Sequence, residues 1–200
     1  MTGGGGPPAV MTEVVSAHAI AQRIDELGAA IRADYAGKEP VLLGVLKGAA
    51  PFLADLSRRL PPQIEIDFLS LTRFGSEGRV GIAVDSATSI AGRHVLLVED
   101  IVDTGLTLSY LLSLLETRRP ASLATVTLLD KRTRRIVDVP LRYRGFEVGD
   151  EFLLGYGLDW EGRYRNLPGL WAVLDLAAFR LDPEAATREA FGGAGDKVRS

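Results

Sequence analysis

Three short and almost wholly apolar runs constrain the fold of this 200-residue chain more than any other feature. They cover residues 41–46, 95–98 and 123–129, and helix-like patterns separate them. Continuous apolar runs of this length indicate strands that are buried on both faces, as the strands of a parallel sheet are. Because such strands alternate with helices, the sequence predicts an α/β domain with crossover helices.

The spacing of apolar residues predicts the helices. The first helix has an apolar face with spacings of four, three and four positions, made by Ile20, Ile24, Leu27 and Ile31. Residues 51–60 predict a second helix that begins at a proline, and residues 105–117 a third with leucines facing inward. Residues 64–71 predict a strand and the polar, glycine-containing residues 72–81 an exposed loop, while short strands and turns follow Pro140.

The two ends of the chain are expected to lie outside a single domain of residues 11–181. Residues 1–10 are mostly Gly and Pro and predict disorder, and residues 182–200 predict a tail with a short helix before a disordered end. Met11 follows the first segment, so translation can start at either Met1 or Met11.

Composition excludes several classes of function. The chain has no cysteine, which excludes thiolate chemistry and agrees with a cytoplasmic protein. The net charge of -3 argues against a nucleic-acid partner, and no apolar stretch approaches the roughly 18 residues of a membrane span. The start of the chain has neither the basic nor the apolar part of a secretory signal.

The strongest chemical signal is the segment VLLVEDIVDTGLT, residues 95–107. A buried strand enters the carboxylates Glu99 and Asp100, and Asp103, Thr104, Gly105, Leu106 and Thr107 follow before the next helix. Ligands of open α/β sheets bind beyond the carboxyl ends of the strands, and amides at a helix start bind phosphate. The carboxylates suit ribose hydroxyls or a metal, so the pattern favours a sugar phosphate. The alternative is that the acidic residues only cap the helix.

This segment resembles the phosphoribosyl pyrophosphate motif of type I phosphoribosyltransferases, in particular that of the hypoxanthine and hypoxanthine-guanine enzymes. Further motifs follow in the family's order from about residue 41 to residue 175. The resemblance implies a twisted, mostly parallel sheet flanked by helices, with a small hood of short strands. It also implies transfer of 5-phosphoribosyl from phosphoribosyl pyrophosphate to a 6-oxopurine with Mg²⁺, in a cytoplasmic dimer or tetramer.

The resemblance assigns the remaining site residues by position. Leu46, Lys47 and Gly48 match the pyrophosphate loop, where the family has a cis peptide, and Arg165 matches a second pyrophosphate contact. On the purine side, Lys131 matches the residue that binds the 6-oxo group, Phe152 the residue that stacks on the ring, and Leu153 the residue that contacts the base edge. Asp159 belongs to the same side, and together with Glu99 and Asp100 it would hold Mg²⁺. Taken singly, each of these residues also has an ordinary interpretation as an exposed cation or a core aromatic.

Asp103 matches the carboxylate that accepts a proton from purine N7, and residues 72–81 match a lid that excludes water. The lid departs from the family at Arg73 and Phe74, which replace a Ser-Tyr pair, and Leu106 replaces a lysine found in some relatives. Two other functions stay open at this point. One is a regulator with this fold that binds RNA through the basic run of residues 131–135, and the other is transfer to adenine, xanthine or a pyrimidine.

Overall fold

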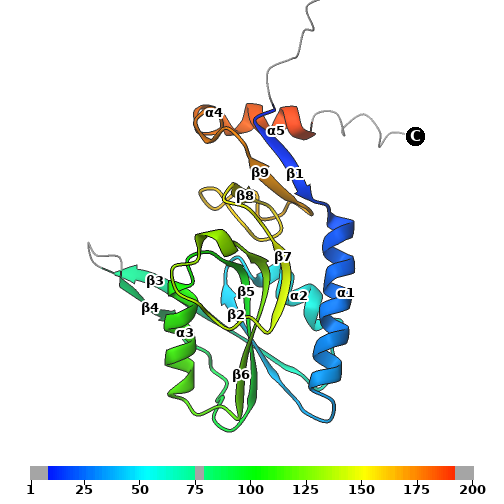
Figure 1. Cartoon of the computed structure of the whole chain (residues 1–200), viewed down its shortest axis with the longest axis vertical. Coiled ribbons are helices and arrows are strands. Elements are labelled where there is room, and N and C mark those ends of the chain that lie inside the picture. The colour runs from blue at the N-terminus through cyan, green and yellow to red at the C-terminus, as the bar shows by residue number, and fades with distance from the viewer. Residues whose placement is uncertain (1–8, 75–78, 192–200) are drawn as a thin grey trace, which may run out of the picture.

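The computed structural model describes residues 9–74 and 79–191 (Figure 1). Its centre is a six-stranded sheet in the order β4-β3-β2-β5-β6-β7, parallel except for the antiparallel pair β3–β4. The strands are β2 (Val41–Leu46), β3 (Glu65–Phe74), β4 (Arg79–Val84), β5 (His94–Val102), β6 (Ser122–Asp130) and β7 (Tyr143–Glu147). The parallel α/β sheet predicted from the apolar runs is confirmed.

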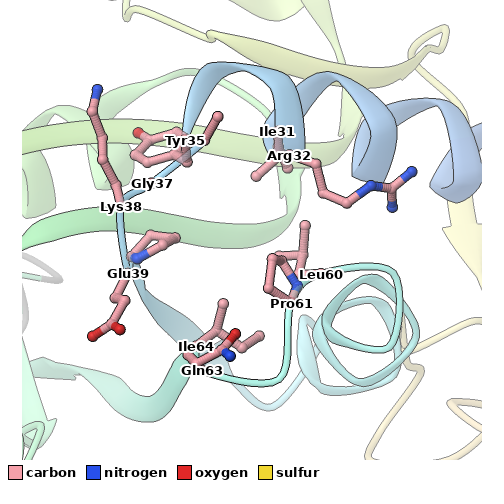
Figure 2. Close-up of a pocket in the computed structure, with 12 residues that line it drawn as sticks. Ile31, Arg32, Tyr35, Gly37, Lys38, Glu39, Leu60, Pro61, Gln63 and Ile64 are labelled. Carbon is pink, nitrogen blue, oxygen red and sulfur yellow. The ribbon is translucent and has the colours of Figure 1, made fainter.

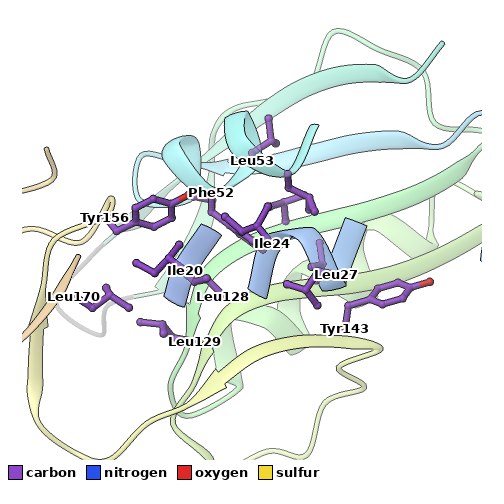
Figure 3. Close-up of a cluster of buried hydrophobic side chains, with 14 of the residues drawn as sticks. Ile20, Ile24, Leu27, Phe52, Leu53, Leu128, Leu129, Tyr143, Tyr156 and Leu170 are labelled. Atoms are coloured by element: carbon purple, nitrogen blue, oxygen red, sulfur yellow. The ribbon is translucent and has the colours of Figure 1, made fainter. Parts of the chain in front are cut away.

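Helices cover both faces of this sheet. On one face, α1 (Ala17–Asp34) and α2 (Ala50–Ser57) form a core cluster with side chains of β2, β5 and β6 (Figure 3). On the other face, α3 (Leu106–Glu116) buries its leucines against the opposite side of β2 and β5. The hydroxyl of Ser16 caps α1 by accepting from the Ala19 amide, and the predicted apolar face of α1 is buried.

A second, small sheet lies above the carboxyl edge of the main sheet and forms the hood. It contains β1 (Met11–Val15), β9 (Leu170–Val173) and β8 (Phe152–Leu154) in that order, all antiparallel. Two helices, α4 (Leu176–Leu181) and α5 (Pro183–Phe191), lie at its outer end (Figure 1). Segments from both halves of the sequence therefore build the hood.

Two expectations were wrong. Residues 72–81 are not a simple loop, because residues 72–74 continue β3 and residues 79–81 begin β4, with Thr72 paired to Gly81. The interstrand hydrogen bonds of this hairpin need no apolar side chains, so the polar sequence concealed it. Strand β5 also continues through Val102, so Glu99 and Asp100 lie within the strand rather than at its end.

The two ends of the described part of the chain meet at the hood. Of the N-terminal segment, residues 1–8 lie outside the described residues, but the Val10 carbonyl accepts hydrogen bonds from the amides of Leu174 and Asp175. Ala186 of α5 is buried in a cluster with Met11, and the predicted end of the tail, residues 192–200, is outside the described part. The division into residues 1–10, 11–181 and 182–200 stays a prediction. None of the described helices has the length and apolar character to cross a membrane.

Candidate active site

A pocket of about 670 Å³ opens at the carboxyl edge of the main sheet. Residues 99–108 and Val80 line it, so the motif singled out in the sequence forms one wall without interruption. Because β4 supplies Val80, the hairpin that replaces the expected loop borders the same pocket.

The turn at the start of α3 is fixed by main-chain contacts. The Thr104 carbonyl accepts from the amides of Ile136 and Val137 at 2.9 and 3.1 Å. Gly105 has a φ of 85°, and a Cβ there would lie 2.3 Å from the Val137 oxygen, so only glycine fits. The N-cap residue, Gly105, has no side chain to cap α3, and the Thr104 hydroxyl accepts from the Leu106 amide at 3.5 Å. The first turn of α3 lines the pocket, and a phosphate is the favoured ligand at such a helix start.

Glu99 and Asp100 bring negative charge to the floor of the site. Glu99 is 7% exposed, and burial raises its pKa well above the ordinary value, with a further rise from the Asp100 charge. Burial also raises the pKa of Asp100, although the Ile101 amide and the Arg165 cation act in the opposite direction. A cation or a row of hydroxyl donors would relieve this accumulation of charge.

The segment Leu46-Lys47-Gly48 lies against these carboxylates. The peptide bond between Leu46 and Lys47 is cis, as in the family that the segment resembles. A Cβ at Gly48 would lie 1.5 Å from Asp100 Oδ2, and a Cβ at Gly157 would lie 2.0 Å from the Gly48 oxygen. Two backbone segments and the Asp100 carboxylate thus meet at a spacing that only glycine permits. The sequence analysis did not single out Gly157, although the pair of glycines around Tyr156 was a signal for it.

Arg165 and Asp159 are brought together beside Asp100. Arg165 pairs with Asp159 at 2.6 Å and also donates to the Gly157 carbonyl at 2.6 Å. The second carboxylate oxygen of Asp159 accepts from the Gly162 amide at 2.7 Å. Both residues therefore lie next to the pyrophosphate loop, but Asp159 already has two partners. Among the residues that the structure describes, no three Asp, Glu or His side chains form a group that could hold a metal by itself.

Lys131 and Phe152, which we call the base wall, are not among the residues that line this pocket, but the Lys131 amide donates to the carbonyl of Val102, which does line it. Lys131 is buried at the end of β6, and its ammonium donates to the carbonyls of Glu151 at 2.6 Å and Asp150 at 3.3 Å. An ammonium has three N–H donors, so one is left for a ligand. Phe152 is half-buried, with its ring 5.4 Å from that of Trp160 in an edge-to-face contact, and the next residue, Leu153, is buried.

Asp103 lines the pocket, in the turn after β5. Its Oδ1 pairs with Arg134 Nε at 2.7 Å, and its carbonyl accepts from Arg135 at 2.9 Å. Arg134 also pairs with Asp150 at 2.6 Å, and this hydrogen bond is the main cause of the lowered pKa of Asp150. Sequence reasoning treated Arg134 only as part of a basic run, because no spacing rule connects it to Asp103.

The structure adds less about the roles of the remaining predicted site residues. Leu106 is the first residue of α3 and is 53% exposed, and Thr104 and Thr107 are half-buried. Arg73 and Phe74 belong to the end of β3, next to residues 75–78, which lie outside the described part. A second pocket of about 260 Å³ contains none of the predicted residues. It lies between the C-terminal end of α1 and the segment before β3 (Figure 2).

Comparisons with known proteins agree with this geometry. The family model described as phosphoribosyl transferase domain matches residues 10–161. The hypoxanthine-guanine phosphoribosyltransferase of Bacillus subtilis (strain 168) is 45% identical over 159 residues, covering 78% of this chain and 88% of that protein.

Solved structures give the same result. A hypoxanthine-guanine phosphoribosyltransferase from Bacillus anthracis superposes with a TM-score of 0.79 at 39% identity, over 82% of this chain and 98% of that one. A hypoxanthine phosphoribosyltransferase from Staphylococcus aureus gives 0.78 at 40% identity, over 81% and 90%. The chain belongs to the phosphoribosyltransferase family and has the type I fold of that family, an enzyme fold that the ordered motifs predicted.

Proposed function

We propose that this enzyme transfers a 5-phosphoribosyl group from phosphoribosyl pyrophosphate to hypoxanthine, guanine or both, and thereby serves purine salvage. The observation that supports the proposal is that Asp103 lines the pocket and that its carboxylate is linked through Arg134 to Asp150, next to the base wall. A phosphate wall offers main-chain amides and glycines to phosphates, and the base wall offers Lys131 and Phe152 to a flat base. The relatives named above carry the same activity in their names.

The phosphate wall fits both ends of phosphoribosyl pyrophosphate. The amides of residues 104–107 suit the 5-phosphate, which has two negative charges, because they lie at the start of α3. Leu46, Lys47 and Gly48, together with Arg165, suit the pyrophosphate, since two cations and a close-packed backbone face that side.

Glu99 and Asp100 fit Mg²⁺. They are adjacent, buried carboxylates whose raised pKa values show an unfavourable accumulation of charge, and Mg²⁺ typically takes one or two carboxylates together with substrate oxygens. Asp159 is the third residue proposed for this ion, on the pyrophosphate side. When bound, the ion supplies positive charge to the leaving pyrophosphate.

In the reaction, the bond from C1′ to the pyrophosphate oxygen breaks and a bond from C1′ to purine N9 forms. We assign Asp103 as the proton acceptor for purine N7, because it lines the pocket and its carboxylate is linked through Arg134 to the segment before Phe152. Lys131 donates to the 6-oxo group, Phe152 stacks on the ring, and Leu153 contacts the base edge. The β3–β4 hairpin, with Arg73 and Phe74, is proposed as the lid that excludes water.

Adenine or xanthine transfer is the second candidate, and it is disfavoured because Lys131 presents only donors. An RNA-binding role is weaker still, since Arg134 and Arg135 of the basic run are engaged in internal ion pairs. A homo-oligomer in the cytoplasm, without nucleic acid or membrane partners, completes the proposal.

The test is pyrophosphate release from phosphoribosyl pyrophosphate and Mg²⁺ with a panel of bases. We expect release with hypoxanthine, guanine or both, and a loss of turnover by about 10²-fold or more in Asp103→Asn, the usual scale of general acid–base catalysis. Absence of release with every base would refute the proposal. Wild-type turnover in Asp103→Asn would remove Asp103 from it.

A further inference from the structure

Two neighbouring arginines of the basic run hold different parts of Asp103. Arg134 Nε pairs with the Asp103 carboxylate at 2.7 Å, and Arg135 donates to the Asp103 main-chain oxygen at 2.9 Å. Arg132, in the same run, is exposed, and its side chain has no hydrogen bond or ion pair in the described ranges 9–74 and 79–191, although its carbonyl accepts from the Arg135 amide. Among the described residues, the run therefore contains two arginines with internal side-chain partners and one without.

Arg135 is the more firmly fixed of the two. Its side chain is 13% exposed and pairs with Asp130, which is itself buried, and Arg144 occupies the second oxygen of Asp130 at 3.0 Å. The Arg135 side chain also packs close to Gly105. The main chain of Asp103 is thus tied to the buried end of β6, which fixes the height of the turn above the sheet.

Arg134 fixes the carboxylate itself. It holds Oδ1 of Asp103 and, with a second nitrogen, Oδ1 of Asp150 at 2.6 Å. Asp150 lies two residues before Phe152, and the Lys131 ammonium donates to the Asp150 carbonyl. One guanidinium therefore spans from the proposed proton acceptor to the wall that would hold the purine. Oδ2 of Asp103 keeps no hydrogen-bond partner in the described part of the chain, so it is free to accept a proton.

From this geometry we infer that Arg134 is a positioning residue for Asp103, setting its carboxylate relative to the Lys131–Phe152 wall. The inference rests on the proposed function, because it assumes that Asp103 accepts the purine proton. The planar fork of arginine suits this task, since it can bind two carboxylates in fixed directions. A proton acceptor has to be held to within about 0.5 Å and 10–20° of its productive geometry, and an unrestrained aspartate on a turn is not.

Arg134 contributes little to the stability of the fold, so the kinetic effect of substituting it can be measured on a folded protein. Its side chain is 43% exposed and its partners are more exposed still, and surface ion pairs of this kind contribute little to stability. Arg134→Met keeps part of the aliphatic stem and removes the fork. Arg132→Met is the matched control, because it removes the same group from the same run without breaking a contact.

The kinetic experiment compares these two variants with wild type. We expect Arg134→Met to lower kcat by about tenfold, less than the roughly 10² of a full 1 Å misplacement, with KM for phosphoribosyl pyrophosphate changed by less than about twofold. Arg132→Met should stay within about twofold of wild type in both constants on the same principle, as a surface change away from special contacts. A kcat in Arg134→Met equal to that of the control overturns the inference.

A double-mutant cycle separates positioning from a general structural effect. If Arg134 acts through Asp103, Arg134→Met should add almost nothing to the loss already present in Asp103→Asn. A full, multiplicative loss in the double variant would show that Arg134 acts elsewhere and would also overturn the inference.

Hydrogen exchange provides a readout that does not need turnover. Amides of residues 103–105 should exchange roughly threefold faster in Arg134→Met than in Arg132→Met, a change within the scale of one surface ion pair. Equal exchange in the two variants contradicts the positioning role even in an inactive protein. Failure of the proposed function is recognised separately, by wild type releasing no pyrophosphate with any base.

Discussion

The two walls of the site are built in different ways. On the phosphate side, Gly105 and Gly157 let backbone segments approach to distances that no Cβ allows, and Gly48 leaves room for the Asp100 carboxylate. On the base side, side chains form the wall. The Lys131 ammonium donates to two carbonyls, and the Phe152 ring packs edge-to-face against Trp160. The phosphate wall depends on the path of the chain, whereas the base wall depends on which side chains it carries.

This difference indicates which property depends on each wall: phosphate binding on the phosphate wall, and the choice of base on the base wall. In the proposed function, backbone amides and glycines bind the phosphates, so a substitution there alters the path of the chain. The side chains of Lys131 and Phe152 can be exchanged without altering that path, so the choice of base is expected to depend on them. The predictions below test that separation, from the largest expected effect to the smallest.

The largest effect is expected in base choice at Lys131. Its free N–H satisfies a 6-oxo group but meets a donor in adenine, so wild type should prefer hypoxanthine to adenine by at least ~10³ in kcat/KM. Lys131→Met should lose most of the activity with 6-oxopurines, and the ratio should collapse. Lys38→Met, at an exposed lysine over the Tyr35 ring in the remote pocket, is the control. A ratio that Lys131→Met does not alter would make Lys131 an ordinary structural lysine.

The next effect concerns the phosphate wall at Gly48. A methyl group there would lie 1.5 Å from Asp100 Oδ2, so Gly48→Ala must displace the Asp100 carboxylate or the pyrophosphate loop. We expect kcat/KM for phosphoribosyl pyrophosphate to fall by about 10²-fold, the scale of a 1 Å misplacement, while the ratio between bases stays unchanged. Gly149→Ala is the control, since its Cβ meets only the end of the exposed Glu151 side chain. A changed base ratio in Gly48→Ala would contradict the separation of the walls.

A smaller effect is expected in stability at Glu99. Burial raises the pKa of Glu99, so its ionised form destabilises the ligand-free protein at neutral pH, and Glu99→Gln should raise Tm by about 2–4 °C. Phosphoribosyl pyrophosphate with Mg²⁺ at ~100 times its Kd should stabilise wild type by about 2.7 kcal/mol, and the variant much less.

Thermal unfolding with and without this ligand is the measurement for Glu99, with the exposed Glu116→Gln as its control. An unchanged ligand shift in Glu99→Gln would exclude Glu99 from the sugar-phosphate site.

The smallest effect is expected at Tyr143 of β7, where neither wall is involved. Burial, followed by hydrogen bonding to Asp34, raises the pKa of Tyr143 to about 12. Because the folded state holds this proton more tightly than the unfolded chain, its contribution to stability is complete below pH 10 and is lost as pH rises to 12. Tyr143→Phe should therefore show a shallower alkaline loss in urea unfolding, with kcat and KM within about twofold of wild type. An identical alkaline loss would contradict the assignment.

The buried helices and strands could be predicted from the sequence because burial requires apolar residues at regular positions. Strand β2 is apolar at every position, and the leucines of α3 recur at helical spacing, so both were identified. The β3–β4 hairpin was missed because an edge pair is held by main-chain hydrogen bonds, and Thr72 and Gly81 carry no pattern that reveals them. The continuation of β5 beyond Val98 was hidden for a related reason, since buried carboxylates resemble the start of a loop.

Individual site residues could be predicted from the sequence where each matches one position in the family's ordered motifs. The positions of Lys131, Asp103 and Gly48 followed from their neighbours in the sequence, although their roles stay proposals. The contacts among them did not follow, because Arg134 meets Asp103 and Gly157 meets Gly48 only after the chain has folded back on itself. Such pairings depend on tertiary structure and leave no local signal.

The hood joins the beginning of the described chain to its end, and this affects the order in which a newly made protein can become active. Strand β1 leaves the ribosome first but pairs only with β9, which is among the last segments to be synthesised. The strands of the main sheet can pair while β1 is still unpaired, although Gly157 and Arg165 of the phosphate wall follow β8 in the chain. During translation the hood, which carries Phe152, can therefore be completed only after the strands of the main sheet have been made.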